Sequence, residues 1–302
     1  MSVAATLVAL TPNLALDRTL RLDRPLLRGS LHRVQESSER AGGKGVNLAR
    51  AVHALGGDPV VAGFLAGWNG RKFKDLLQSE GIAGVFEDVA GETRECHALL
   101  DGGDHPTEVN EAGPTVPASA WTSLLARLPS GQLVLSGSLP PGVGGDEFVD
   151  LVARLPERPV VDMSGAALSA AVKAGAAMVA PNRREFAALL ERDTATIDDA
   201  IAFYETHGVP VLLSLGADGA AFLGEDRWRV RAPDVRAVNP VGSGDCLLGA
   251  FLWARGQGHD AGEALRWGVA AGSDNARRGG GGAVSADGIR ELFALTAYEE
   301  VH

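Results

Sequence analysis

The feature that most constrains the fold is a series of short apolar runs without polar alternation. Such runs are typical of strands covered on both faces. Stretches with helical spacing lie between them, and this alternation predicts βαβ units, hence a parallel sheet with helices on both faces. The predicted strands are 5–10, 60–64, 133–136, 160–162, 178–180 and 211–215, and the predicted helices include 46–55, 73–80, 148–155, 185–191 and 197–207.

Two segments, 14–40 and 92–112, depart from this rhythm. They are more polar, and residues 19–22 and 96–100 show the alternation of half-exposed strands. Both follow predicted sheet strands, at the edge where open α/β sheets bind ligands. We interpret them as a small antiparallel lid inserted into one domain that spans 1–302. Surface loops with edge strands would give the same pattern, which alone does not decide between the two.

Composition limits the partners. The formal net charge of −10 over 302 residues argues against nucleic acid, because binding its backbone needs clustered Lys and Arg. Cys96 and Cys246 have no metal-ligand spacing. No apolar stretch reaches the roughly 20 residues that span a bilayer, and the start lacks a basic leader region. We therefore expect a cytoplasmic protein with small-molecule ligands and neither a membrane nor a nucleic-acid partner.

The most informative segment is the turn Val241-Gly242-Ser243-Gly244-Asp245, which leads into the apolar run 246–253. Its glycines permit a nest of free N–H groups at the start of a helix, where a phosphate would bind. Asp245 could cap this helix, or it could accept the proton of a hydroxyl that receives a phosphoryl group. The string of a Walker A loop is absent, and Leu247 stands where a dinucleotide fingerprint needs glycine.

A second glycine cluster, Gly42-Gly43-Lys44-Gly45, also runs into a predicted helix. Backbone can approach a polyhydroxylated ligand closely here, and Asn47 can exchange hydrogen bonds with hydroxyls. Asp17 follows the first strand, at an edge where it could hold a sugar hydroxyl. A simple glycine turn followed by a solvated lysine would give the same Gly42-Gly43-Lys44-Gly45 string.

Two further strings follow predicted strands. Asn182 and Glu185, three residues apart, could organise the water shell of Mg²⁺ or form a helix capping box, and both roles can hold together. Ser214, Gly216 and Gly219 belong to a turn that could bring backbone close to nucleotide phosphates, or that is only a glycine turn.

With these residues assembled, the chain resembles the PfkB group of ribokinase-like carbohydrate kinases over nearly its whole length. Residues 42–47 are similar to the family's early sugar-site signature, and residues 239–245 to its late signature, which contains an anion hole and a catalytic base. The resemblance implies an α/β, ribokinase-like three-layer sandwich with a central, mainly parallel sheet and a small β-sheet lid. It also implies ATP and Mg²⁺ as cofactors and a homodimer that forms through the lid.

Residues 91–94, 107–111 and 135–142 look like the subgroup that phosphorylates ketohexose monophosphates. This implies 1-phosphofructokinase activity first, with tagatose-6-phosphate kinase and 6-phosphofructokinase as alternatives. A non-catalytic sugar-phosphate sensor would keep the sugar cluster but lose the base or the anion hole, and this chain keeps both. Cys96 is a departure, because the subgroup usually has asparagine there.

The resemblance also assigns roles to individual positions. Asp245 would be the catalytic base, with Gly242, Ser243 and Gly244 forming the anion hole. The sugar would be held by Asp17, Gly42, Gly43, Asn47 and Ser138, and its existing phosphate by Lys44 and Arg94. The nucleotide side would comprise Asn182, Ser214, Gly216, Gly219, Gly244 and Asn275, with Glu185 and Asn182 holding the metal through water.

Overall fold

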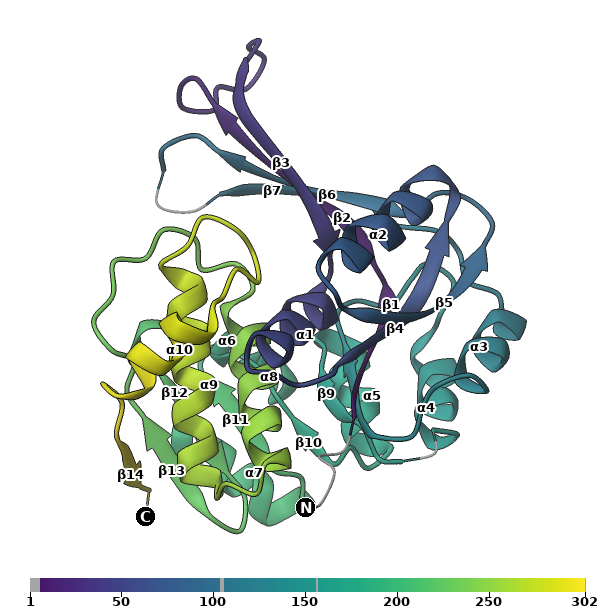
Figure 1. The fold of residues 1–302 in the computed structure, drawn as a ribbon. Helices are drawn as coiled ribbons and strands as arrows, with labels where there is room; N and C mark the ends of the chain where they lie inside the picture. The colour runs from purple at the N-terminus through teal and green to yellow at the C-terminus, as the bar shows by residue number, and fades with distance from the viewer. Residues whose placement is uncertain (1–5, 104–105, 156, 302) are drawn as a thin grey trace.

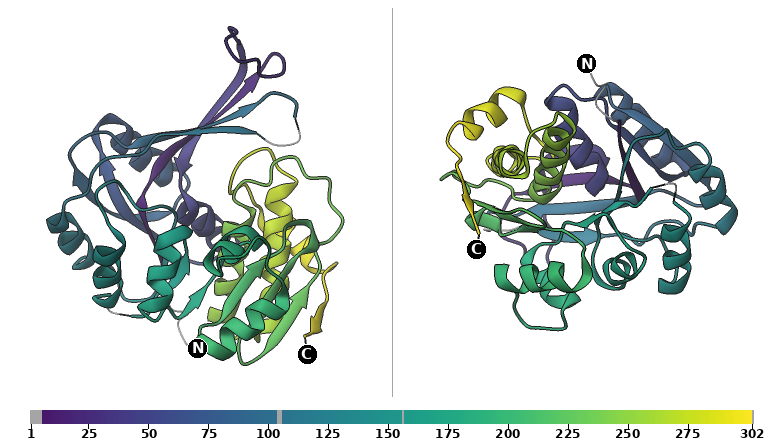
Figure 2. Two further views of the ribbon diagram at one scale, coloured as in Figure 1. Left: turned by 180° about the vertical axis from the view of Figure 1, so that it is seen from behind. Right: turned by 90° about the horizontal axis from the view of Figure 1, so that it is seen from below.

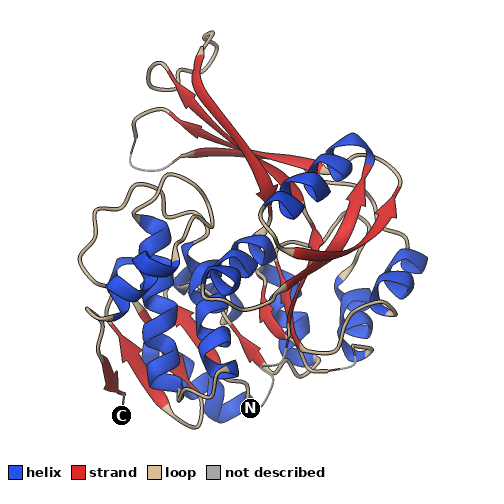
Figure 3. Cartoon of the chain, in the orientation of Figure 1, coloured by secondary structure: helices blue, strands red, loops and turns tan. Residues whose placement is uncertain are grey.

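The computed structural model describes residues 6–103, 106–155 and 157–301, which form two sheets (Figure 1 and, with strands in red, Figure 3). Ala5, the first residue of the first predicted strand, lies outside the described residues. So do residues 104–105 of the second predicted lid segment.

The central sheet is mainly parallel, as the sequence predicts. Its strands are β1 (Leu7–Asn13), β4 (Val60–Ala66), β5 (Ala83–Val89), β8 (Gln132–Ser136), β9 (Val160–Asp162), β10 (Met178–Val179), β11 (Val211–Ser214), β12 (Ala220–Leu223), β13 (Arg227–Val230) and β14 (Tyr298–Glu300). They follow the order β14-β13-β12-β11-β10-β9-β8-β1-β4-β5. The strands from β11 to β5 pair in parallel, whereas β12, β13 and β14 add an antiparallel edge.

Helices cover both faces of this sheet, which explains why its strands show no polar alternation. In β1, Leu7 and Ala9 pack on one side and Val8 and Leu10 on the other. The first side carries α1 (Lys44–Ala54), α2 (Gly67–Ser79), α8 (Ser243–Gly256) and α9 (Ala261–Ala276), with α10 (Ala286–Phe293) against α9. The second carries α3 (Ala118–Leu125), α4 (Gly145–Ala153), α5 (Gly165–Lys173), α6 (Arg183–Leu189) and α7 (Ile197–His207). Figure 2 shows the resulting three layers from two further directions.

The second sheet has four strands, which arise from the two segments predicted as a lid. They are β2 (Ala15–Leu22), β3 (Val34–Gly42), β6 (Arg94–Leu100) and β7 (Thr107–Asn110), in the order β3-β2-β6-β7. The outer pairs are antiparallel as expected, but β2 and β6 run parallel. Both β2 and β6 start at the main body and run outward from it. Between them the chain returns to the central sheet, where it forms β4 and β5.

This sheet projects beyond the main body (Figure 1), and its burial changes along its length. At the base, Leu14, Leu16 and Ala41 are buried in a cluster with α2 and β4. Toward the tip, Leu27 and Leu31 are exposed.

Among the helices of the described residues, none is both long enough and apolar enough to cross a membrane.

Candidate active site

Two cavities meet at the carboxyl edge of the parallel strands. The larger, of about 420 Å³, lies between the base of the four-stranded sheet and the main body. The smaller, of about 250 Å³, lies over the ends of β9 and β11 and the start of α6. Lys44 and Asp245 line both cavities, so they lie at the junction where two ligands could meet.

Most of the residues predicted to hold a sugar are brought together in the larger cavity. Its wall includes Asp17, Gly43, Lys44, Asn47, Arg94 and Ser138, together with Gly242. Gly42 is not among its lining residues in the described chain. Gly42 instead leaves room for Asp17, because a Cβ at Gly42 would lie 2.2 Å from the carboxyl carbon of Asp17.

Asp17 and Cys96 lie on neighbouring lid strands and both face the larger cavity. Burial raises the pKa of Asp17 to about 6, although Arg50 and Arg94 act to lower it. Burial also raises the pKa of the Cys96 thiol to about 11. This wall therefore offers a carboxyl group that can hold hydroxyls and, beside it, a neutral thiol.

The turn before α8 has the form of an anion-binding nest. Gly242 adopts the left-handed conformation, with φ of 82°, and α8 begins at the next residue. A Cβ at Gly244 would meet nothing within 4 Å, so its backbone is open on the side of the smaller cavity. The backbone N–H of Ser243 donates to the carbonyl oxygen of Pro240 at 3.1 Å, so it closes the turn and is not one of the free groups that the sequence predicted. This arrangement directs free N–H groups and the positive end of a helix dipole toward one place.

Asn275 does not line either cavity in the described chain. It lies on α9 behind the turn, where its Nδ2 donates to the carbonyl oxygen of Val241 at 2.8 Å and to Oγ of Ser243 at 2.9 Å. The geometry makes Asn275 a support of the turn, whereas the sequence placed it on the nucleotide side.

Asp245 does not cap α8, since its side chain accepts no hydrogen bond from the helix start. Its carboxylate instead accepts a hydrogen bond from Nδ2 of Asn47 at 2.9 Å, and it is only 8 % exposed. Burial and the nearby charge of Asp162 raise the pKa of Asp245, whereas Lys44 and Asn47 act to lower it. A carboxylate with a raised pKa can act as a general base near neutral pH.

Lys44 contacts carboxylates at the junction. Its Nζ lies 2.7 Å from Oδ1 of Asp162 and 3.6 Å from Oε1 of Glu185. Burial acts to lower the pKa of Lys44, but Asp162, Asp245 and Glu185 outweigh it and raise that pKa. The ammonium group is therefore charged and directed toward the smaller cavity.

The sequence placed Lys44 beside Arg94 on a sugar phosphate, whereas the contacts of these two residues differ. Arg94 lies at the base of the lid, and its guanidinium donates to the carbonyl oxygens of Asn13 and Glu111. It lines only the larger of the two cavities, whereas Lys44 lines both.

On the nucleotide side, Asn182, Glu185, Ser214 and Gly244 line the smaller cavity. Asn182 and Glu185 form the predicted capping box of α6: Oδ1 of Asn182 accepts from the backbone of Glu185 at 2.9 Å, and Oε2 of Glu185 accepts from the backbone of Asn182 at 2.9 Å. The other carboxylate oxygen of Glu185 faces Lys44.

Gly216 and Gly219 form the predicted turn between two strands, with a short 3-10 helix at Gly216–Asp218. Neither is among the lining residues of the two cavities in the described chain. Gly219 has a packing reason to be glycine, because a Cβ there would lie 2.0 Å from the carbonyl oxygen of Val230.

Sequence reasoning gave no role to Asp162 or Asn13. Asp162 ends β9, is buried, and pairs with Lys44 across 118 residues. Nδ2 of Asn13 donates to Oγ of Ser138 at 3.2 Å and so joins two walls of the larger cavity. The available signal was a polar residue that ends an apolar strand at the ligand edge of the sheet.

The glycine turn at 279–282 packs against the same site. A Cβ at Gly282 would lie 2.4 Å from Oδ1 of Asn47, and one at Gly242 would lie 2.8 Å from the backbone nitrogen of Gly282. Nη1 of Arg40 donates to the carbonyl oxygen of Gly281 at 3.2 Å. The turn thus connects the lid base with the anion-binding nest.

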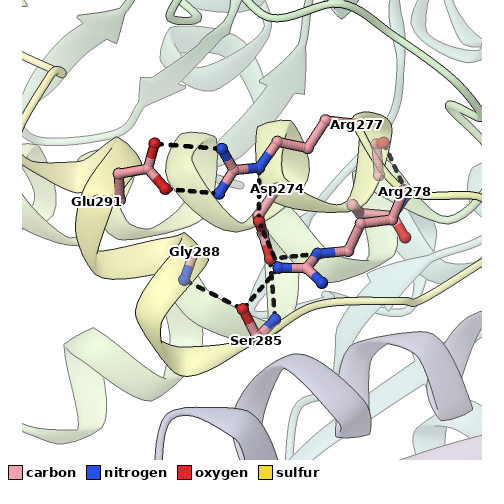
Figure 4. A network of polar contacts seen from close by, with 8 residues as sticks. Asp274, Arg277, Arg278, Ser285, Gly288 and Glu291 are labelled. Carbon is pink, nitrogen blue, oxygen red and sulfur yellow. Dashed lines mark hydrogen bonds and ion pairs between the residues drawn. The ribbon is translucent and has the colours of Figure 1, made fainter.

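A buried carboxylate holds both ends of this turn (Figure 4). Asp274, on α9, accepts hydrogen bonds from Arg277 Nε at 2.9 Å and Arg278 Nε at 3.0 Å, just before the turn. It also accepts one from the backbone of Ser285 at 2.8 Å, just after the turn. Because Asp274 is fully buried, these contacts fix where the turn begins and ends.

The chain is similar to known proteins over most of its length. The profile of the pfkB family carbohydrate kinases matches residues 11–287. A 1-phosphofructokinase of Haloferax volcanii is 38% identical over 272 residues, which cover 87% of this chain and 88% of that protein. A tagatose-6-phosphate kinase of Staphylococcus epidermidis is 30% identical over 311 residues, covering 98% of this chain and all of the relative.

A solved structure of phosphofructokinase-2 from Escherichia coli, in complex with substrates and products, has a similar fold. It superposes with a TM-score of 0.89 and 28% sequence identity, covering 96% of this chain and 99% of the other. The ribokinase-like α/β fold expected from the sequence is thereby confirmed.

Proposed function

The chain belongs to the pfkB family of carbohydrate kinases, and we propose that it transfers the γ-phosphate of ATP to the free hydroxymethyl group of a ketohexose monophosphate. The observation that carries this proposal is the position of Asp245 at the junction of two cavities. We favour fructose 1-phosphate, which would give fructose 1,6-bisphosphate, because a 38% identical relative is a 1-phosphofructokinase. Tagatose 6-phosphate and fructose 6-phosphate are the alternatives.

Asp245 would accept the proton of the hydroxymethyl group as its oxygen attacks the γ-phosphorus. Backbone N–H groups of Gly242 and Gly244 would stabilise the charge on the transferring phosphoryl group, and Ser243 would hold the turn between them through its bond to Pro240. Lys44 would lie beside that same group, since its ammonium faces Asp162 and the smaller cavity. Lys44 would therefore bind the phosphate that is transferred, and not the phosphate that the sugar already carries.

The sugar would lie in the larger cavity. Asp17, Gly43, Asn47 and Ser138 would contact its hydroxyls, and Gly42 would leave room for Asp17. Arg94 would bind the existing phosphate, because a guanidinium offers donors that match phosphate oxygens. The four-stranded sheet would close over the sugar as the lid of a single domain, and so exclude water.

ATP would occupy the smaller cavity, near Asn182, Ser214 and Gly244, with Gly216, Gly219 and Asn275 shaping the backbone around it. No three His, Cys, Asp or Glu residues in the described chain could together hold a metal ion. This fits Mg²⁺, which keeps much of its water shell and arrives on the phosphates. Glu185 and Asn182 would hold that water shell, and the ion would neutralise phosphate charge.

Two copies would pair through the lid, and exposed apolar side chains support this: Leu27 and Leu31 in the connection between β2 and β3, Val34 on β3 and Val109 on β7. Light scattering should then give a dimer, and Leu31→Asp should weaken it.

Because ATP is made and used in the cytoplasm, we place the enzyme there.

An ADP-release assay with fructose 1-phosphate, fructose 6-phosphate and tagatose 6-phosphate tests the proposed reaction. Fructose 1-phosphate should give the highest kcat/KM. A higher value for another of the three would move the assignment to that sugar. Binding of a sugar phosphate without any turnover would instead indicate the non-catalytic sensor.

A further inference from the structure

We propose that Arg50 is a positioning residue that holds the amide of Asn47 as a hydrogen-bond donor to Asp245. The inference rests on the proposed role of Asp245 as the base and extends it by one residue. All three side chains are buried at the junction of α1 and α8.

The two ends of the Asn47 amide face different partners. Nδ2 donates to Oδ2 of Asp245 at 2.9 Å, and Oδ1 accepts from Nη1 of Arg50 at 3.1 Å. The two ends are almost identical in shape, so chemistry decides which way the amide faces. A guanidinium only donates hydrogen bonds. Arg50 therefore requires the amide oxygen on its own side, which leaves the NH₂ group for Asp245.

Arg50 is itself fixed. Its Nε and Nη2 donate to the two carboxylate oxygens of Glu80 at 2.6 and 2.7 Å, and Nη2 also donates to the carbonyl oxygen of Ala41 at 2.7 Å. The side chain is only 5 % exposed. A two-pronged contact of this kind fixes orientation as well as distance, so the guanidinium cannot turn away from Asn47.

This arrangement matters because Asp245 changes charge during the proposed reaction. Before proton transfer it is a carboxylate, which accepts the Asn47 hydrogen bond; afterwards it carries a proton. An amide free to rotate could then turn its oxygen toward that proton and stabilise the neutral form. Arg50 prevents this rotation, so Asn47 favours only the charged form of the base.

Other titratable groups also surround Asp245. Lys44 lies at the start of α1, Asp162 ends β9, and the Cys246 thiol follows on α8. Arg50→Lys alters none of them, and it keeps the positive charge that pairs with Glu80 and that also acts to lower the pKa of Asp17. A lysine, however, lacks the planar fork that reaches Glu80, Ala41 and Asn47 together. The variant therefore separates orientation of the amide from simple charge.

The test is the pH profile of kcat/KM for the preferred sugar phosphate, whose acid limb reports the pKa of the base. In Arg50→Lys we expect this limb to move upward by about one pH unit, which is about a tenfold loss of kcat/KM at acid pH. Arg266→Lys is the matched control. Arg266, on α9, donates to the carbonyl oxygens of Phe293, the last residue of α10, and of Thr296, which follows that helix. This contact lies away from both cavities, so the acid limb of Arg266→Lys should stay in place.

Asn47→Ala supplies the second arm. If Arg50 acts through Asn47, adding Arg50→Lys to Asn47→Ala should produce no further shift of the acid limb. An unchanged profile in Arg50→Lys, or the same shift in the Asn47→Ala background, would overturn the inference. Should Arg50→Lys fail to fold, Glu80→Gln loosens the fork with Arg50 in place and should move the limb the same way by less.

A direct readout separates this inference from the proposed reaction. The pKa of Asp245 can be followed by ¹³C NMR of its carboxyl carbon, with Asp245→Asn to assign the signal, and this needs no turnover. An upward shift in Arg50→Lys would support the role of Arg50 even if the wild type phosphorylated none of the three sugars. Equal pKa values in the two proteins would reject that role even if the wild type were fully active.

Discussion

Asp245 and Asp274 are two buried carboxylates on neighbouring helices, and their surroundings are opposite. Asp274 accepts hydrogen bonds from two arginines and a backbone N–H group (Figure 4). Asp245 receives one amide hydrogen bond, lies close to Asp162, and shares the ammonium of Lys44 with two other carboxylates. The difference indicates two roles. Asp274, whose charge is compensated by hydrogen-bond donors, stabilises the structure, whereas Asp245, whose charge is poorly compensated, remains able to take a proton.

The largest effect expected from this comparison is on turnover. Asp245→Asn should lower kcat by about 10² to 10⁴, the usual contribution of a general base. ATP binding should change little, because asparagine keeps the size of the side chain and leaves the backbone nest intact. Single-turnover kinetics and a nucleotide-binding titration measure the two quantities.

The stability of the same variant is its control. Asparagine removes a buried charge whose pKa is raised, so Asp245→Asn should unfold at a urea concentration no lower than the wild type at pH 8. A kcat within about tenfold of the wild type would show that another group takes the proton.

The second prediction concerns stability instead of turnover. Asp274→Asn leaves Arg277 and Arg278 without their shared carboxylate, and we expect it to lower the free energy of unfolding by about 3 kcal/mol. Urea unfolding measures this loss. Glu291→Gln is the matched control, because Glu291 pairs with Arg277 at an exposed position and its loss should cost much less than that of Asp274. Equal losses in the two variants would remove the distinction between Asp274 and an ordinary surface partner.

Sequence patterns predicted the elements well because those patterns are local. The apolar runs that became β1, β4, β8 and β9 are visible in windows of a few residues, as is the glycine nest before α8. The parallel pairing of β2 with β6 was not predictable in this way, because polar alternation marks a half-exposed strand but carries no direction.

The candidate site was less accessible, because its contacts join distant segments. Lys44 and Asp162 are 118 residues apart, and Asn47 and Asp245 are 198 apart. The sequence therefore proposed Lys44 as a partner of Arg94, and it missed Asp162. In the same way, Asp245 and Asp274 each stand within an apolar helical segment, and only the packing shows that one faces arginines and the other a carboxylate.

The smallest expected effect extends the comparison to Asp17, a third carboxylate with limited compensation. Its pKa rises from 3.8 to about 6 on folding, so the folded state binds more protons than the unfolded state between these values. The stability cost therefore grows as pH rises through this window and is complete above about pH 6. Asp17→Asn removes it, and we expect a gain of about 1 kcal/mol at pH 8, since water in the cavity screens part of the charge.

Urea unfolding of Asp17→Asn and of the wild type, each at pH 8 and at about pH 5, measures this gain, which should be smaller at the lower pH because the wild-type carboxyl is then mostly protonated. Asp287→Asn is the control, because the Asp287 side chain is fully exposed and lies outside both cavities. A loss of stability in Asp17→Asn at pH 8 would mean that Asp17 is compensated as Asp274 is. Of these three carboxylates, Asp245 alone would then be poorly compensated. A raised pKa would identify the base and not every carboxyl group that faces the sugar cavity.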